Sequence, residues 1–304
     1  MTSSITILDG GMGRELERVG APFRQPEWSA LALMEAPETV AEVHAAYVAA
    51  GANVITTNSY ALVPFHIGQE RFDRDAERLA DLAGQLARGA ADAGQGVRVA
   101  GSLPPVFGSY QPELFEPELA RHYLSVLVRG LAPHVDLWLA ETQSSLEEAE
   151  AAADATRHTG KPLWLSFTLR DDEDDLPVPQ LRSGEAVTEA AALAVQLGAA
   201  AMLFNCSRPE VMGPALKAAH AAQPELTLGV YANAFSDSQD EEGAANEVVS
   251  TIRADLDPPH YAQWADGWVG KGARIVGGCC GIGREHIHHL SGRLGLRCDR
   301  PDSA

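Results

Sequence analysis

The most reactive feature of this sequence is a pair of adjacent cysteines, Cys279 and Cys280. Neighbouring Cα atoms lie about 3.8 Å apart, below the roughly 4.4 to 6.8 Å of an ordinary disulfide, so the pair can bridge itself only with strain. Two adjacent thiolates can instead bind one soft metal, and zinc prefers tetrahedral sulfur or nitrogen ligands. Cys206 can supply a third sulfur, which leaves one open position for a substrate. The alternative is that all three are buried small hydrophobic residues.

Two carboxylates, Asp9 and Glu141, are the next candidates for chemistry. Together at one site they suit an ammonium group or general acid and base catalysis. Taken singly, Asp9 can shape the turn into the following glycines, and Glu141 can cap the helix after it. The histidine-rich segment 284–289 lacks the H-E-x-x-H spacing, so we interpret it as a solvated helix face with one packed histidine.

The elements that must position these residues alternate along the whole chain. Short apolar, β-branched runs predict strands at 5–8, 53–57, 98–101, 136–140, 162–168, 201–205, 226–231 and 273–277. Stretches rich in Ala, Leu and Glu predict helices at 37–50, 69–93, 117–133, 146–159, 183–197, 209–222, 258–270 and 284–294. Eight strands, each followed by a helix, predict a closed (β/α)8 TIM barrel, with an open doubly wound sheet as the alternative. We expect a single domain over 1–304, with a loose tail from about 298 that holds Cys298.

The candidate residues fall where such a barrel does its chemistry. In this fold the active site lies at the carboxyl ends of the strands. The first predicted strand runs into Asp9, the fourth into Glu141, the sixth into Cys206 and the eighth into the cysteine pair. Placement at one rim supports both the strand count and a shared site.

Glycines surround the cysteine pair at positions 277, 278, 281 and 283. They allow a tight turn from strand to helix, and they also permit a phosphate cradle, which is the competing use of such a segment. Two long connections, 170–182 and 233–257, carry acidic runs and are either lids or solvated insertions.

Composition excludes several function classes. The chain has 23 Lys and Arg against 42 Asp and Glu, a net charge of −19, which disfavours nucleic acid and anionic membranes as partners. The N-terminus lacks the basic start and apolar run of a secretory signal, and no apolar stretch approaches the roughly 20 residues of a membrane span. We therefore expect a cytoplasmic protein whose partners are small molecules, and the sequence leaves its oligomeric state open.

Five segments together resemble the zinc-dependent homocysteine S-methyltransferase family over nearly the whole chain. They are 9–16 (DGGMGREL), 56–60 (TTNSY), 141–142 (ET), 205–207 (NCS) and 277–281 (GGCCG). The resemblance implies a (β/α)8 barrel with Zn²⁺ held by Cys206, Cys279 and Cys280. It also implies that Asp9 and Glu141 bind the homocysteine ammonium group, and that Asn58 and Asn233 line the substrate pocket.

The implied reaction is methyl transfer from an onium donor to the thiol of homocysteine, which gives methionine. The zinc-activated substrate thiol is the nucleophile, and no further catalytic side chain is expected. Arg14 stands where the family often has Thr, and Gly281 where it often has Arg, which leaves the donor open. S-methylmethionine is favoured over S-adenosylmethionine and betaine. The alternatives are a metal-free phosphate-binding barrel lyase or aldolase, and a non-catalytic zinc or thiol sensor.

Overall fold

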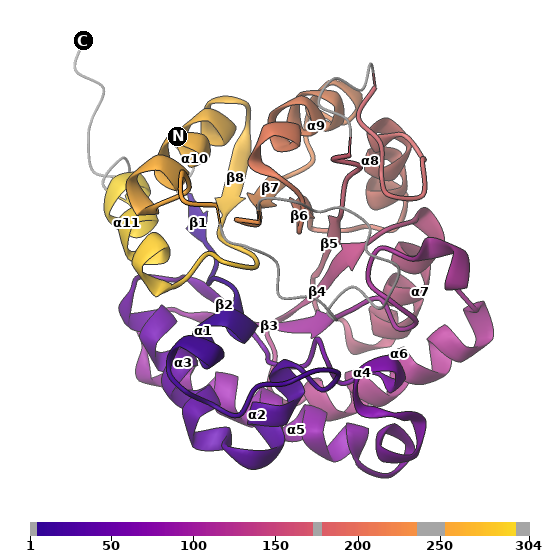
Figure 1. Ribbon diagram of the computed structural model, residues 1–304. Coiled ribbons are helices and arrows are strands. Elements are labelled where there is room, and N and C mark those ends of the chain that lie inside the picture. Colours follow the sequence, from indigo (N-terminus) through magenta and orange to yellow (C-terminus); the bar gives the residue numbers. More distant parts are fainter. Residues whose placement is uncertain (1–4, 173–177, 236–252, 296–304) are drawn as a thin grey trace.

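Eight short parallel strands form the centre of the molecule (Figure 1), a computed structural model that describes residues 5–172, 178–235 and 253–295. The strands are β1 (Thr6–Ile7), β2 (Val54–Thr56), β3 (Arg98–Leu103), β4 (Leu137–Gln143), β5 (Leu163–Phe167), β6 (Ala201–Asn205), β7 (Leu228–Tyr231) and β8 (Ala273–Val276). Each overlaps one predicted strand, and β3 and β4 run two and three residues further than expected because their last residues line the mouth of the barrel.

The sheet closes on itself between its first and second strands. Hydrogen-bonded neighbours run in the order β1, β8, β7, β6, β5, β4, β3 and β2. Leu8 then forms a parallel bridge with Val54, and the Asp9 amide donates to the Val54 carbonyl over 3.1 Å. An open doubly wound sheet has two free edges, so that alternative is wrong. The (β/α)8 barrel is confirmed.

Helices surround the barrel as the periodicity predicts. The eight outer helices are α3 (Pro37–Ala49), α5 (Gln69–Ala93), α6 (Pro117–Leu131), α7 (Leu146–Thr156), α8 (Val187–Gln196), α9 (Pro209–Ala222), α10 (Pro258–Gly270) and α11 (Arg284–Gly295). Only α8 starts clearly later than predicted, because residues 180–186 form a turn closed by a Gln180–Ala186 bridge. On α11, His286 packs against Tyr261 and contacts the Leu256 carbonyl over 2.9 Å, as expected of one packed histidine.

Short helices before and after β2 and within later connections were not predicted. They are α1 (Met12–Arg18), α2 (Ser29–Glu35), α4 (Pro64–Ile67), and the 3-10 turns η1 (Pro112–Leu114) and η2 (Arg157–Thr159). In Figure 1, α1 and α2 lie at the mouth of the barrel beside β1 and β2. They cover the end at which the candidate residues gather.

Apolar side chains fill the barrel and leave only one end for chemistry. Every strand or its immediate extension contributes to an interior cluster that includes Val54, Leu139, Trp164, Leu203 and Ile275. A larger cluster packs the outer helices onto the sheet. Water is thereby excluded from below the site.

Among the described residues, the helices include none long and apolar enough to cross a bilayer. The cytoplasmic location stays a prediction. The tail from 298 lies outside the described residues, as does most of the acidic stretch in 233–257.

Candidate metal and substrate site

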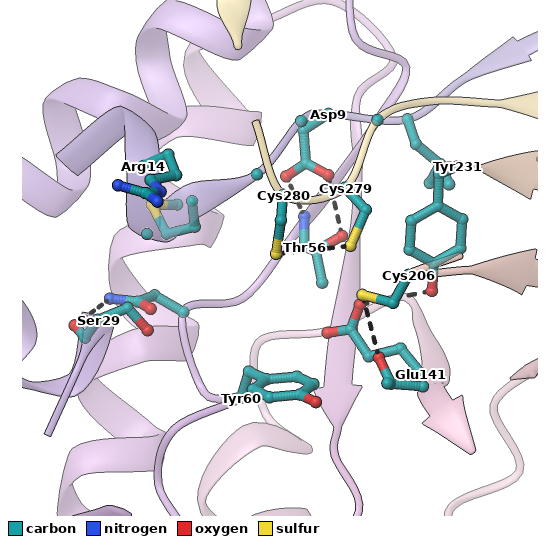
Figure 2. Close-up of a pocket in the computed structure, with 18 of the residues that line it drawn as sticks. Asp9, Arg14, Ser29, Thr56, Tyr60, Glu141, Cys206, Tyr231, Cys279 and Cys280 are labelled. Carbon is teal, nitrogen blue, oxygen red and sulfur yellow. Dashed lines mark hydrogen bonds between the residues drawn. The ribbon is translucent and has the colours of Figure 1, made fainter. Parts of the chain in front are cut away.

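A cleft opens at the carboxyl ends of the strands, with an empty volume of about 830 Å³ including its open mouth. A concave lining with a few converging polar groups suits a small-molecule site. Figure 2 shows its polar and sulfur-bearing side chains pointing toward one another from different strands. Its lining includes Asp9, Asn58, Glu141, Cys206, Cys279 and Cys280, which are six of the seven residues that sequence reasoning selected.

The three cysteines meet on the floor of this cleft. Cys206 follows β6, Cys279 and Cys280 follow β8, and their sulfur atoms all lie within 4.8 Å of one another. The Sγ atoms of Cys279 and Cys280 are 4.0 Å apart. Sulfur ligands at about 2.3 Å from a tetrahedral zinc ion would be roughly 3.8 Å apart, so small adjustments bring all three onto one ion. This convergence favours a metal site over the alternative of three buried small hydrophobic residues.

The Cys206 thiol is held by a neighbour under backbone strain. Thr142 Oγ1 donates to Cys206 Sγ over 3.6 Å, and Asn205 fixes Thr142 through two hydrogen bonds of 2.9 and 3.0 Å. Thr142 and Cys206 have φ angles of 59° and 49°, a region that a β-branched residue rarely adopts. The other positive-φ residues besides glycine among the described residues, Trp28 and Tyr110, line the same cleft. Such strain typically collects at functional sites.

Interlocked turns place the cysteine pair against the end of β1. Gly11 N donates to the Ile282 carbonyl over 2.9 Å, and Gly278 N donates to the Asp9 carbonyl over 3.0 Å. A Cβ atom on Gly11 would lie 2.6 Å from the carbonyl oxygen of Cys279. Several backbone N–H groups of this segment, including that of Cys279, donate hydrogen bonds to carbonyl groups of the protein. They are not available to bind a phosphate, which disfavours a phosphate cradle.

Asp9 is buried and Glu141 is half-buried in the cleft that holds the sulfur atoms. Asp9 accepts hydrogen bonds from the amide and hydroxyl of Thr56 over 2.7 and 3.0 Å. Glu141 accepts from the Ser102 hydroxyl, and from the Tyr231 hydroxyl over 3.4 Å. Burial raises the pKa of Asp9 to about 7 and that of Glu141 to about 8. Neither carboxylate caps a helix, and both are poised to ionise fully when a cation pairs with them.

The three thiols differ in pKa. Hydrogen bonds from Cys279 and Cys280 lower the pKa of Cys206 well below that of a free thiol. The hydrogen bond with Cys206 raises the pKa of each partner in turn. Three thiolates this close repel one another, so a cation between them is the natural way to ionise all three.

Comparisons with known proteins agree with this geometry. A family model described as homocysteine S-methyltransferase matches residues 6–294. The homocysteine S-methyltransferase of Escherichia coli K12 is 32% identical over 297 residues, which cover 91% of each chain. The chain belongs to the homocysteine S-methyltransferase family. It is therefore a methyltransferase.

Other relatives extend this picture. The selenocysteine methyltransferase of Astragalus bisulcatus is 27% identical and is matched over 90% of this chain and 88% of its own. The crystal structure of the Escherichia coli homocysteine methyltransferase MmuM in its metallated form has a TM-score of 0.77 at 28% identity. That match covers 96% of this chain and 97% of the other. By name, these relatives act on a sulfur and on a selenium acceptor.

The two predicted asparagines of this methyltransferase take different places. Asn58 lines the cleft, and its side-chain amide donates to the Ser29 carbonyl over 3.1 Å, which fixes α2 to the end of β2. Asn233 follows β7 and is not among the described residues that line the cleft. Its buried Oδ1 atom has no hydrogen-bond partner within the described part of the chain.

Of the aromatic residues in the cleft wall, Tyr60 belongs to the segment 56–60 selected from the sequence, whereas Trp28 and Tyr110 were not predicted. The rings of Trp28 and Tyr60 meet edge to face, with centroids 5.9 Å apart. Tyr110, from the connection between β3 and α6, lies under the guanidinium of Arg182, 4.8 Å from its ring centroid. That connection is long and irregular, and its length was the available signal for a binding loop.

The connection after β5 begins with a buried acidic residue, and residues 173–177 of its acidic run lie outside the described residues. Asp171 is buried and pairs with Arg182 over 2.7 Å, although the acidic run suggested a solvated insertion. Asp171 also accepts the Arg208 amide over 3.0 Å. This residue therefore anchors the base of the connection and, through Arg182, supports Tyr110 at the cleft wall.

Arg14 carries the one cationic side chain among the described residues that line the cleft. It lies on α1, contacts Glu17 over 2.7 Å, and places its guanidinium 5.8 Å from the ring centroid of Phe235. Its side chain is only 18% exposed. In Figure 2 the cysteine sulfur atoms lie between Arg14 on one side and Glu141 and Tyr231 on the other. The cleft therefore has a cationic and an anionic end.

Proposed function

We propose that this enzyme transfers a methyl group from an onium donor to the thiol of homocysteine, giving methionine, with Zn²⁺ on Cys206, Cys279 and Cys280. One observation carries the proposal, namely that three converging thiols share a single cleft with two carboxylates, Asp9 and Glu141. A sulfur-binding centre next to an ammonium-binding centre matches the two functional ends of an amino acid thiol.

The donor set fits zinc. Three thiols from two barrel loops lie close to tetrahedral spacing on the lining of the cleft that a substrate would enter, so Cys206, Cys279 and Cys280 would hold the ion. The chemistry that zinc would supply when bound is deprotonation of the substrate thiol at neutral pH, while three thiolates keep that sulfur electron-rich. Thr142 holds the Cys206 thiol through its hydroxyl group.

Asp9 and Glu141 hold the ammonium group in this scheme. Their own partners, Thr56, Ser102 and Tyr231, fix the carboxylates before substrate arrives. An arriving ammonium group favours the ionised carboxylates and opposes the rise in pKa that burial imposes on them. The ion pairs form away from bulk water, where charge interactions are strong.

The transfer of the methyl group needs no acid or base from the protein. A bond forms between the acceptor sulfur and the methyl carbon as the bond from that carbon to the donor breaks. The broken bond's electron pair stays on the donor, which leaves neutral, and the thiol proton has already left for solvent. Charge is annihilated in this step, so a cleft with apolar walls favours it over bulk water. The rings of Trp28, Tyr60 and Tyr110 can face the onium cation.

The first test is metal content with cysteine variants. We expect about one zinc per chain by plasma mass spectrometry, and loss of both zinc and activity in Cys206→Ala and Cys279→Ala with the barrel still folded by circular dichroism. Cys298→Ala is the matched control and should keep both properties. Fully active, metal-free variants at positions 206 and 279 would contradict the proposal.

The second test is a panel of methyl donors with homocysteine, following methionine by mass spectrometry. We propose S-methylmethionine as the preferred donor, and the panel includes S-adenosylmethionine and betaine as alternatives. Selenocysteine belongs in the acceptor panel because a relative bears that name. No product with any pair, together with four protein ligands on the metal in an X-ray absorption spectrum, would favour a zinc sensor. Bound phosphate without metal would favour a barrel lyase.

A further inference from the structure

We propose that Arg14 recognises the carboxylate of the methyl donor and so helps to select the donor. The inference rests on the proposed methyl transfer and assigns a specificity-determining residue to it.

The charges of the cleft lining favour such a group. Asp9 and Glu141 supply negative charge and the three thiols form the floor. Arg14, which also pairs with Glu17, is the single cation among the described lining residues. The onium centre of a donor is attracted to the thiolate floor and repelled by a guanidinium. A donor with only a positive charge therefore gains nothing from Arg14. A donor that also has a carboxylate can place its cation near the thiolates and its carboxylate at Arg14.

Arg14 is held in place before any donor arrives. Its Nη1 atom contacts Glu17 over 2.7 Å, and the Phe235 ring packs against the guanidinium from the loop after β7. With an 18% exposed side chain, it lies at the edge of the cleft and not in open solvent. A guanidinium has five N–H donors, so a contact with Glu17 is compatible with a further carboxylate. A fork that is already oriented loses little entropy on binding.

The position of Arg14 relative to the sulfur atoms gives the donor a direction. Arg14 and Glu141 lie on opposite sides of the sulfur atoms in Figure 2. Homocysteine with its ammonium at Glu141 and a donor with its carboxylate at Arg14 would approach the floor from opposite ends. The methyl group then lies between the two sulfur atoms, as in-line transfer requires.

The test compares S-methylmethionine with its methyl ester, which keeps the sulfonium and the ammonium but lacks the carboxylate. The kcat/KM ratio of acid to ester is measured in the wild type, Arg14→Gln and Arg14→Lys. We expect the wild type to prefer the acid by about 10- to 100-fold, the range of a charge-assisted hydrogen bond. Arg14→Gln should abolish this preference, and Arg14→Lys should keep part of it because an ammonium group retains the charge without the fork.

Matched controls keep the test decisive. Arg78 lies on α5, is 67% exposed and contacts Asp75, so Arg78→Gln removes one positive charge elsewhere and should leave the ratio unchanged. An Arg14→Gln variant that loses acid and ester activity equally would show a structural role and overturn the inference. A wild type that uses both donors equally would overturn it without any variant.

A binding measurement separates this inference from the proposed function. Calorimetric titration of zinc-loaded protein with the acid and with the ester, homocysteine omitted, detects recognition in the absence of transfer. If no donor yields methionine, the proposed function fails, whereas a preference for the acid that Arg14→Gln removes still supports carboxylate recognition. Equal affinity of the wild type for acid and ester refutes that recognition even when methionine forms.

Discussion

Replacing His44 with leucine should make the enzyme less sensitive to acid. His44 lies on α3, is fully buried, and neither ring nitrogen has a hydrogen-bond partner among the described residues. Burial lowers its pKa from 6.5 to about 4, so the unfolded chain takes up the proton first as the pH falls. Stability that is complete above pH 6.5 is then lost progressively toward pH 4.

The loss can be sized from this pKa shift. Each unit is worth about 1.36 kcal/mol, so between pH 7 and pH 5 the His44 contribution falls by about 2 kcal/mol. Leucine has a similar volume and no polar atoms, so it should be neutral or stabilising at pH 7. The free energy of unfolding of the variant minus that of the wild type should therefore be about 2 kcal/mol larger at pH 5 than at pH 7.

Urea unfolding of zinc-depleted protein, followed by circular dichroism, gives the free energy of unfolding of the variant and of the wild type at pH 7 and pH 5. Other groups that titrate in this interval act on both proteins alike and cancel. His288→Gln, on the exposed face of α11, is the matched control and should lose as much stability as the wild type. Equal losses in the wild type and His44→Leu would refute the assignment of acid sensitivity to this buried ring.

Three further predictions concern the site and its supports. Gly11→Ala places a Cβ atom 2.6 Å from a carbonyl oxygen of the turn after β8 and should weaken zinc binding by about 1 to 3 kcal/mol in a chelator competition. Its control, Gly89→Ala in open space on α5, should stabilise the fold by about 0.5 to 1 kcal/mol. Glu141→Gln should raise the KM for homocysteine about 10- to 100-fold in steady-state assays at unchanged zinc content, and a lowered zinc content instead would contradict a substrate role. Arg182→Gln breaks the buried ion pair with Asp171, whose carboxylate keeps the hydrogen bond from the Arg208 amide, so urea unfolding should show a loss of about 3 to 5 kcal/mol. Adding Asp171→Asn should recover part of this loss, and no recovery would argue against the pair.

The repeating pattern and the cysteine placement were both readable from the sequence. Most strands are short apolar runs that are buried on both faces. In the outer helices apolar residues recur at the helical period, so local patterns set these elements. Because parallel strands of a barrel all point the same way, a residue that follows a strand must lie at the mouth. This rule brought Asp9, Glu141 and the cysteines together before any coordinates.

The wall of the cleft was decided by tertiary structure. The helices α1 and α2 are seven residues each, too short for a reliable period, and their packing over the mouth depends on contacts with distant segments. Tyr110 owes its place to Arg182, which in turn pairs with Asp171, and no local pattern links these three positions. The same holds for the contact between Arg14 and Phe235, whose residues are far apart in the chain.

The barrel, its single chemical face and the three thiols at that face could be predicted from the residue pattern, because strands and helices follow from local periodicity. The bridge between Leu8 and Val54, the distances between the sulfur atoms and the place of Arg14 in the cleft lining became known only from the folded structure. Those facts depend on the twist of the sheet and on long-range side-chain packing, which no short window of residues encodes.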